Sequence, residues 1–254
     1  MDTTLKEKGR IHWIDNVRAV AFINMILYHL MFDLVYIFGV NVKWYRGTPG
    51  YIWQQAICMA LIFVSGMSCN FSKNNLKRGL VIFVCGMLMT VGTWLFMPSQ
   101  FIVFGILHFL GIARIIFAFG EKPLGKLNKM AGFAVAIALF ALTKKLPSGY
   151  LGIWDKPLWE LPDVLYQSKL LFWAGLPHAT FSSGDYFPVL PWIFLYLAGY
   201  YFFGILKERG LEGKRFKAVP ALSFIGKHTL FIYVLHQPVI YGVLTVLSML
   251  GVFN

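Results

Sequence analysis

Long apolar segments separated by short polar and basic loops run through the whole chain. The pattern predicts seven membrane-spanning helices, at residues 11–38, 51–70, 79–96, 101–119, 130–142, 188–206 and 224–250. A further apolar segment, 164–176, is short and contains Gln167 and Lys169, so we expect an interfacial or re-entrant piece there. The predicted fold class is therefore all-α: a polytopic membrane helix bundle with about seven transmembrane helices, formed by residues 1–254 as a single domain.

Composition supports this class. The chain is 58% hydrophobic and 13% charged, with a mean hydropathy of +0.65, and these values exclude an ordinary soluble domain. The first apolar segment is too long and too charged for a cleaved signal peptide, so we expect it to remain as a spanning helix. The three cysteines lie within apolar segments without metal-ligand spacing, and no His/Asp/Glu pair outside the site proposed below has such spacing, so we predict no metal.

The basic residues predict the orientation in the membrane. Of the 23 Lys and Arg residues, fourteen lie before the first helix and in the loops 71–78, 120–129 and 207–220. The alternate segments contain six, so the positive-inside rule predicts a cytoplasmic amino terminus and an outside carboxyl terminus. Because topology explains these clusters, the net charge of +12 does not indicate nucleic-acid binding. We expect a multi-pass protein of an inner or plasma membrane.

The first helix carries polar residues that are costly in hydrocarbon unless they face protein or water. Arg18 and His29 are eleven residues apart, which is about three helical turns, so both side chains lie on one stripe with about 20° of residual rotation. The helical rise separates them by about 16 Å. Asp33 follows His29 by four residues and joins the same stripe. One helix thus presents a cation, an apolar run and a His/carboxylate pair.

The other polar residues can be assigned to the cytoplasmic or the outer half of the membrane from their positions along the predicted helices. With the predicted orientation, Arg18, Arg114 and Lys227 lie in the cytoplasmic half. The outer half contains His29 and Asp33 together with His108 and Asp185, and His236 lies near the middle. This arrangement suits a long anionic molecule that enters from the cytoplasm with its reactive end outward. His108, Arg114 and His236 are equally compatible with structural roles, the last because Pro238 frees a backbone carbonyl that a side chain could serve.

The Arg, ten residues, His spacing of Arg18 and His29 resembles the signature of the membrane acyltransferase-3 family. The wider pattern resembles bacterial proteins related to the heparan-alpha-glucosaminide N-acetyltransferase catalytic domain, in the stretches IDNVRAVAFINMILYHLMFDL (14–34), IFVSGMS (62–68), FGILHFLGIA (104–113), DYFPVLPW (185–192) and IGKHTLFIYVLHQP (225–238). Ala19 departs from the glycine common in relatives. The lysosomal branch has Asn in the slot of His29, so the role of this histidine follows the acyltransferase-3 pattern.

The resemblance implies transfer of an acyl group, usually acetyl, from cytosolic acyl-CoA to an acceptor across the membrane, often a sugar. Our hypothesis is that Arg18, with Arg114 and Lys227, binds the CoA phosphates. His29 then acts as general base or as transient acyl carrier, and Asp33 orients it. Acceptor-binding candidates are His108, Asp185 and His236, beneath an outer roof at 143–187.

Several points stay open at this stage. The acceptor is a sugar, a glycan or a lipid-linked molecule, the protein contacts membrane lipid, and a homo-oligomer is compatible with the sequence. The main alternative is a transporter or flippase of an anionic or lipid-linked substrate that uses the same buried charges. Against it, the chain has no repeated half and no matched broken helices. A non-catalytic scaffold leaves the stripe of Arg18, His29 and Asp33 unexplained.

Overall fold

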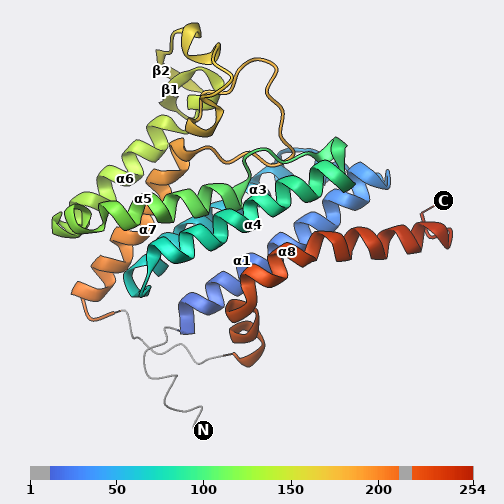
Figure 1. Ribbon diagram of the computed structural model, residues 1–254, viewed down its shortest axis with the longest axis horizontal. Helices are drawn as coiled ribbons and strands as arrows, with labels where there is room; N and C mark the ends of the chain where they lie inside the picture. Colours follow the sequence, from blue (N-terminus) through green and yellow to red (C-terminus); the bar gives the residue numbers. More distant parts are fainter. Residues whose placement is uncertain (1–11, 212–218, 254) are drawn as a thin grey trace. The chain divides into compact units, whose positions relative to one another are not determined.

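A computed structural model describes residues 12–211 and 219–253 of the chain. Helices dominate it (Figure 1), and the long ones are α1 His12–Phe32, α3 Thr48–Met67, α4 Asn75–Phe96, α5 Ile106–Lys126, α6 Lys129–Thr143, α7 Val189–Glu208 and α8 Pro220–Met249. The short elements are η2 Asp33–Ile37, α2 Lys43–Arg46, η3 Ser68–Phe71, η4 Pro98–Gln100, η5 Leu146–Ser148, β1 Tyr150–Ile153, β2 Lys156–Glu160, η6 Asp163–Tyr166 and η7 Phe172–Ala174. Each of the seven predicted helices corresponds to one long helix.

Among the described residues, six helical segments are long and apolar enough to cross a membrane. They are Trp13–Ile37, Thr48–Phe71, Asn75–Phe96, Lys129–Ser148, Val189–Glu208 and His228–Met249. The predicted span at 101–119 differs, because α5 begins only at Ile106 and its first five turns include Arg114, Glu121 and Lys122. A mostly helical membrane protein is therefore confirmed, while the count of seven spans and the orientation of the termini stay predictions.

The chain forms two compact units, and the first comprises residues up to 64 and from 210 onward. In this unit α1 lies along α8 (Figure 1). Phe22 and Met25 of α1 pack with Ile57 of α3, and side chains of α8, Ile225 and Tyr233 among them, cover this cluster. At Gly226 a side-chain carbon would lie 3.1 Å from the backbone oxygen of Asp15, so a glycine permits this close approach of α8 to α1.

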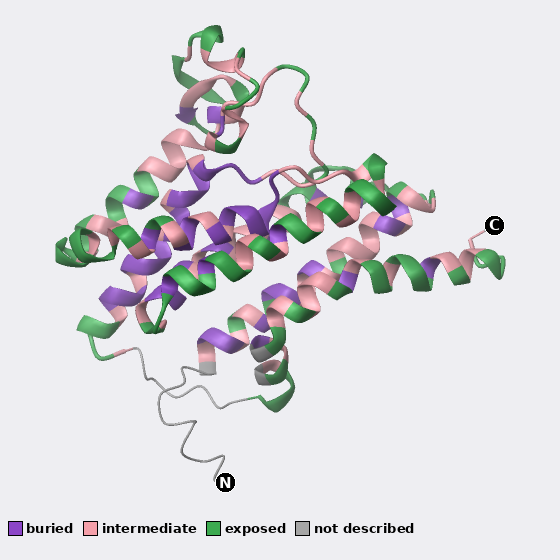
Figure 2. Cartoon of the chain, viewed as in Figure 1, coloured by how far each residue is buried: buried purple, intermediate pink, exposed green. Residues whose placement is uncertain are grey.

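The second unit comprises residues 65–209. Here α4 packs on α5, and α6 packs on α7. Figure 2 shows α7 largely buried, whereas α4 has a mostly exposed outer side. The exposed side chains of α4 are mainly apolar, among them Leu80, Val84 and Leu88, as expected for a helix that faces lipid.

Small residues allow close helix packing at the end of α3, and Gly66 is the example. A Cβ atom at Gly66 would overlap the backbone oxygen of Tyr196 on α7. We predict that Gly66→Ala lowers the free energy of unfolding by about 1–3 kcal/mol, because the helices must move apart. Thermal unfolding in detergent measures this. Gly92→Ala on α4 is the matched control, since nothing lies within 4 Å of its Cβ position; an equal loss there would contradict the prediction.

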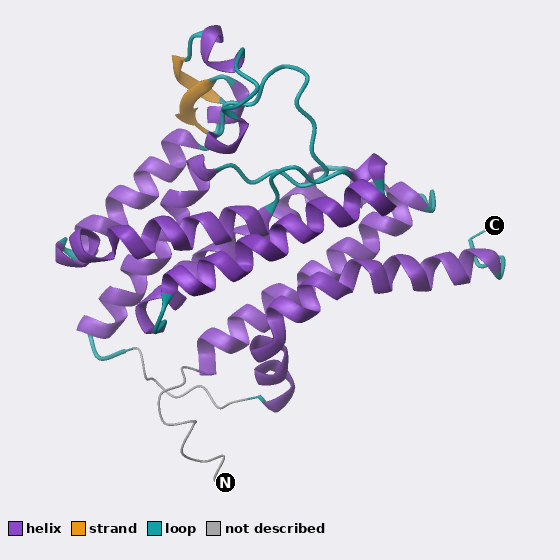
Figure 3. Ribbon diagram, viewed as in Figure 1, coloured by secondary structure: helices purple, strands orange, loops and turns teal. Residues whose placement is uncertain are grey.

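The roof at 143–187 departs from the expected all-α class. Strands β1 and β2 form an antiparallel hairpin (Figure 3). In it Tyr150 pairs with Glu160, and Ile153 pairs with Lys156. Within 164–176 the structure has only short 3₁₀ turns, η6 and η7, and no spanning helix. The described part of the chain is therefore mainly helical with one small hairpin. The hairpin forms where polar and aromatic residues replace the long apolar runs.

Candidate functional site

Helix α1 positions two of the predicted site residues near its end. His29 lies in the last turn of α1, and the chain continues at Asp33 into the π-helical segment η2. Single π-helical turns within α-helices are rare and occur often at functional sites. The side chain of Asp33 is completely buried. The predicted continuous first helix is thus confirmed through Ile37, with a change of helix type beginning at Asp33.

Two adjacent residues of α8 contact these two side chains. Nε2 of His236 lies 3.1 Å from Nδ1 of His29, with the ring centroids 4.9 Å apart. The next residue, Gln237, donates from Nε2 to Oδ1 of Asp33 at 2.7 Å. We expected Asp33 to orient His29, but in the structure His236 bonds to His29 and Gln237 bonds to Asp33. The reason is that α8 places one polar side chain beside each of them.

His236 is itself held by its own helix. It is 7% exposed, and its Nδ1 lies within hydrogen-bonding distance of the carbonyl oxygen of Tyr233, one turn earlier. The carbonyl that Pro238 leaves without a helical N–H partner is that of Val234, so this bond to Tyr233 is not the one that the sequence predicted. With both ring nitrogens engaged, His236 has no nitrogen left for an acceptor molecule.

The Asp33 and Gln237 pair leaves hydrogen-bonding capacity unused. Oδ2 of Asp33 and Oε1 of Gln237 are buried, and neither has a partner among the described residues. Both atoms are hydrogen-bond acceptors, so a hydroxyl or amine would satisfy them. Sequence reasoning missed Gln237, although it directly follows His236 and is the only other amide or ionisable residue in that turn of the predicted helix.

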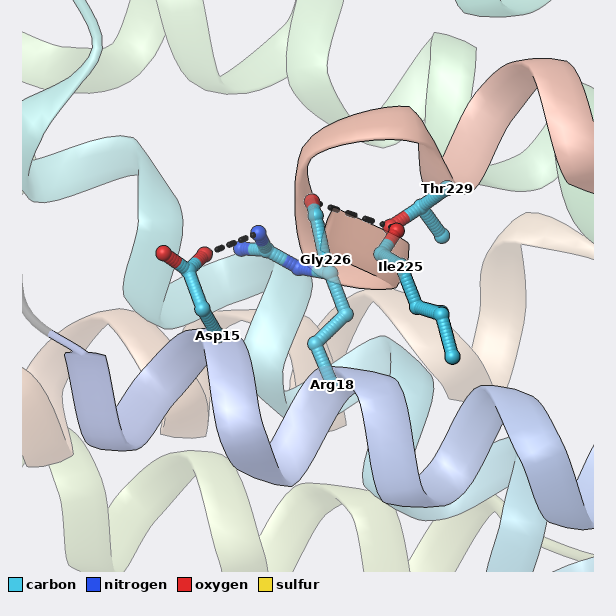
Figure 4. A network of polar contacts seen from close by, with 5 residues as sticks. All are labelled: Asp15, Arg18, Ile225, Gly226 and Thr229. Carbon is cyan, nitrogen blue, oxygen red and sulfur yellow. Dashed lines mark hydrogen bonds and ion pairs between the residues drawn. The ribbon is translucent and has the colours of Figure 1, made fainter. Parts of the chain in front are cut away.

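Arg18 lies in the same unit and forms an ion pair. Its Nη1 is 3.1 Å from Oδ1 of Asp15, and Figure 4 shows the guanidinium between Asp15 and the turn of α8 at Gly226. In that turn Thr229 donates to the backbone oxygens of Ile225 and Gly226. Arg18 therefore already has a carboxylate partner, one that the i, i+3 spacing could have predicted. Lys227 lies on α8, but its side chain is outside the described residues.

Arg114, on α5 in the other unit, has a different environment. It is 6% exposed and faces Cys69 and Tyr196, whose Sγ and Oη atoms are 2.7 Å apart. Its Nε and Nη2 have no hydrogen-bond partner, and no carboxylate of residues 12–211 or 219–253 forms an ion pair with it. A buried guanidinium without a counter-ion is costly.

His108 and Asp185 come together at the start of α5. Oδ2 of Asp185 accepts from the backbone N–H of Ile106 at 2.9 Å. The Nδ1 of His108 accepts from the N–H of Gly105 at 3.2 Å, and its Nε2 is 3.2 Å from Oγ1 of Thr90. Both side chains were predicted to bind acceptor, and this stays a prediction. In the structure they also bond to N–H groups at the start of α5, where the first N–H groups of a helix need partners.

Asp185 precedes α7 and has a perturbed pKa. Burial raises the pKa of its carboxyl to about 6, against the opposing effect of the Ile106 N–H bond. Because the folded-state pKa is raised, the stabilisation by the protonated form is complete below about pH 4 and is lost as the pH rises through 6. We predict that the melting temperature of the wild type falls between pH 4 and 6 relative to Asp185→Asn, which keeps an acceptor for Ile106. Parallel pH profiles of the two would contradict this.

The roof contains a cavity of about 500 Å³. Phe181 stacks on Phe172 with ring centroids 5.2 Å apart, and Tyr186 packs at 4.9 Å from Phe181. Serine hydroxyls and aromatic faces together suit a sugar ring. The cavity is lined by Pro147, Pro177, His178, Ala179, Phe181, Ser182, Ser183 and Tyr186. Among the described residues no three His, Cys, Asp or Glu side chains are grouped to hold a metal ion.

Comparison with known proteins identifies the family to which the chain belongs. No curated protein and no solved structure matches the chain significantly. The catalytic domain family described as heparan-alpha-glucosaminide N-acetyltransferase, catalytic, matches residues 10–238. The match includes the paired residues of α1 and α8 and ends directly after Gln237 and Pro238. The chain therefore belongs to the heparan-alpha-glucosaminide N-acetyltransferase catalytic domain family.

Proposed function

We propose that this protein transfers the acetyl group of cytosolic acetyl-CoA to a hydroxyl or amine of an acceptor at the outer side of a bacterial plasma membrane. Membership of an N-acetyltransferase family and the apolar helices support a multi-pass membrane acetyltransferase. The observation that carries the catalytic assignment is His29. One ring nitrogen is bonded to His236, and the other has no hydrogen bond among the described residues.

In this proposal His29 is the general base. Its free ring nitrogen removes the proton from the acceptor hydroxyl or amine as that group attacks the thioester carbonyl. The tetrahedral intermediate then collapses, the carbon–sulfur bond breaks, and the imidazolium returns the proton to the leaving CoA thiolate. In the covalent variant His29 first accepts the acetyl group and passes it to the acceptor, which predicts ping-pong kinetics.

Asp33 and Gln237 serve the acceptor in the same proposal. Their two unpaired acceptor atoms would receive hydrogen bonds from hydroxyl or amine groups of a sugar, a glycan or a lipid-linked molecule. The roof cavity is the second candidate for acceptor binding, and His108 and Asp185 support it indirectly through the start of α5.

The donor phosphates require cations. Arg114 is the first candidate, because its guanidinium is buried and has no counter-ion among the residues that the structure describes. Arg18 and Lys227 remain candidates, with Arg18 already paired to Asp15. Arginine suits phosphate because its planar fork donates two parallel hydrogen bonds.

Release of CoA thiol tests the function. We expect the purified protein in liposomes to release CoA from acetyl-CoA only when a suitable amino sugar or glycan is present, with one acetylated product for each thiol. Acetyl-CoA enclosed on one side and acceptor on the other would show whether transfer crosses the membrane. Movement of acceptor across the bilayer without thiol release would instead favour a transporter.

A further inference from the structure

The hydrogen-bond chain that ends at His29 begins at a backbone carbonyl. The carbonyl oxygen of Tyr233 only accepts hydrogen bonds, so Nδ1 of His236, which lies against it, carries a hydrogen. A neutral imidazole has one N–H group. The Nε2 atom of neutral His236 therefore has a lone pair and acts as an acceptor.

The same reasoning extends to His29. Its Nδ1 is 3.1 Å from Nε2 of His236. Because this Nε2 accepts the hydrogen bond, Nδ1 of His29 must donate it. Neutral His29 thus has its hydrogen on Nδ1 and its lone pair on Nε2. This Nε2 is the nitrogen with no hydrogen bond among the described residues. The contact with α8 selects which nitrogen of His29 is basic.

We infer that His236 is a positioning residue for the acetyl transfer: it fixes His29 in the tautomer whose free Nε2 can remove the acceptor proton. The inference rests on the proposed function for its catalytic consequence. When Nε2 takes the proton, Nδ1–H stays hydrogen-bonded to His236 and the imidazolium is stabilised. When Nε2–H passes to the CoA thiolate, the starting tautomer is restored without a further proton donor.

This role replaces the acceptor-binding role expected for His236. It gives His236 the function that a buried carboxylate has in other histidine bases, namely to hold the tautomer and orientation of the catalytic ring. In this protein the carboxylate Asp33 is bonded to Gln237 instead. The two α8 residues therefore have separate tasks, one toward the base and one toward the neighbouring carboxylate.

Nuclear magnetic resonance of histidine tautomers tests the inference without any turnover. The protein is labelled with ¹⁵N-histidine and placed in lipid nanodiscs, and His29 is assigned by the signals that disappear in His29→Gln. We expect a protonated Nδ1 and an unprotonated Nε2 at neutral pH. The opposite tautomer, or a doubly protonated ring, would overturn the inference whatever the activity.

Two variants of His236 test the consequence for catalysis. Gln at this position retains an acceptor oxygen for Nδ1–H of His29, whereas Leu has none. We expect His236→Leu to lower kcat about 10- to 100-fold with an unchanged KM for acetyl-CoA, and to mix the two His29 tautomers. His236→Gln should restore much of kcat.

Equal kcat values for the folded Leu and Gln variants would overturn the positioning role. If His236→Leu does not fold, two other measurements decide. The predicted tautomer in the wild type, together with substantial kcat in His236→Gln, supports the role. The other tautomer in the wild type overturns it. A wild type without acetyl transfer would remove the proposed function, while the His29 spectrum would still test the tautomer assignment.

Discussion

Replacing His29 by glutamine is expected to abolish most acetyl transfer while the protein keeps its fold. Glutamine has a similar size and can hydrogen-bond to His236, but it cannot accept a proton at neutral pH. Loss of a general base lowers kcat by about 10²- to 10⁴-fold. The affinity for acetyl-CoA should stay at the wild-type value, because His29 is not among the residues proposed to bind the CoA phosphates. Thiol release and acetyl-CoA titration measure the two quantities.

The matched control is His228→Gln, on α8. His228 is exposed and its described contact is a ring contact with Phe224, with centroids 4.7 Å apart. We expect wild-type turnover from this variant. Wild-type turnover from His29→Gln would refute the assignment of the base. A trapped acetyl group on His29 when acceptor is omitted would select the covalent variant of the mechanism.

Much of the fold was predictable because apolar length and polar loops are local properties of the sequence. The long helices lie where the hydropathy pattern predicts them, and the continuous helix through His29 and Asp33 follows from the same pattern. The hairpin of β1 and β2 was not predicted. Its turn, Trp154–Asp155, has Trp154 at a φ of 56°, whereas Asn-Gly or Asp-Gly is the usual signal for such turns.

It was harder to predict which site residues bond to each other than to predict which residues belong to the site. Helical periodicity indicates which residues share a face, but the crossing of α1 and α8 decides which side chains meet. That crossing depends on close approaches such as Gly226 against Asp15, and a single sequence does not specify them. Hence His29 and His236 were both identified as candidates, but their hydrogen bond was not. The ion pair of Arg18 with Asp15 is different, because both residues lie on one helix.

Replacing Arg114 by methionine is expected to weaken acetyl-CoA binding strongly without destabilising the protein. Each hydrogen bond from a charged group contributes about 1.5–3 kcal/mol, so loss of one such bond weakens binding by about 10- to 150-fold. The unliganded fold should be as stable as the wild type or more stable. A buried cation without a counter-ion costs free energy, and methionine fills a similar volume without charge.

Titration of acetyl-CoA and thermal unfolding, each on the unliganded protein, measure the two effects. Arg78→Met is the matched control, because Arg78 is an exposed residue of α4, and it should bind acetyl-CoA normally. Arg18→Met separates the two arginines: the ion pair with Asp15 predicts a smaller loss of affinity than at Arg114. A larger loss at Arg18, with Arg114→Met binding normally, would move the phosphate site to α1. A large loss of stability in Arg114→Met would contradict the prediction. It would mean that the contacts with Cys69 and Tyr196 already make the guanidinium stabilising in the unliganded protein.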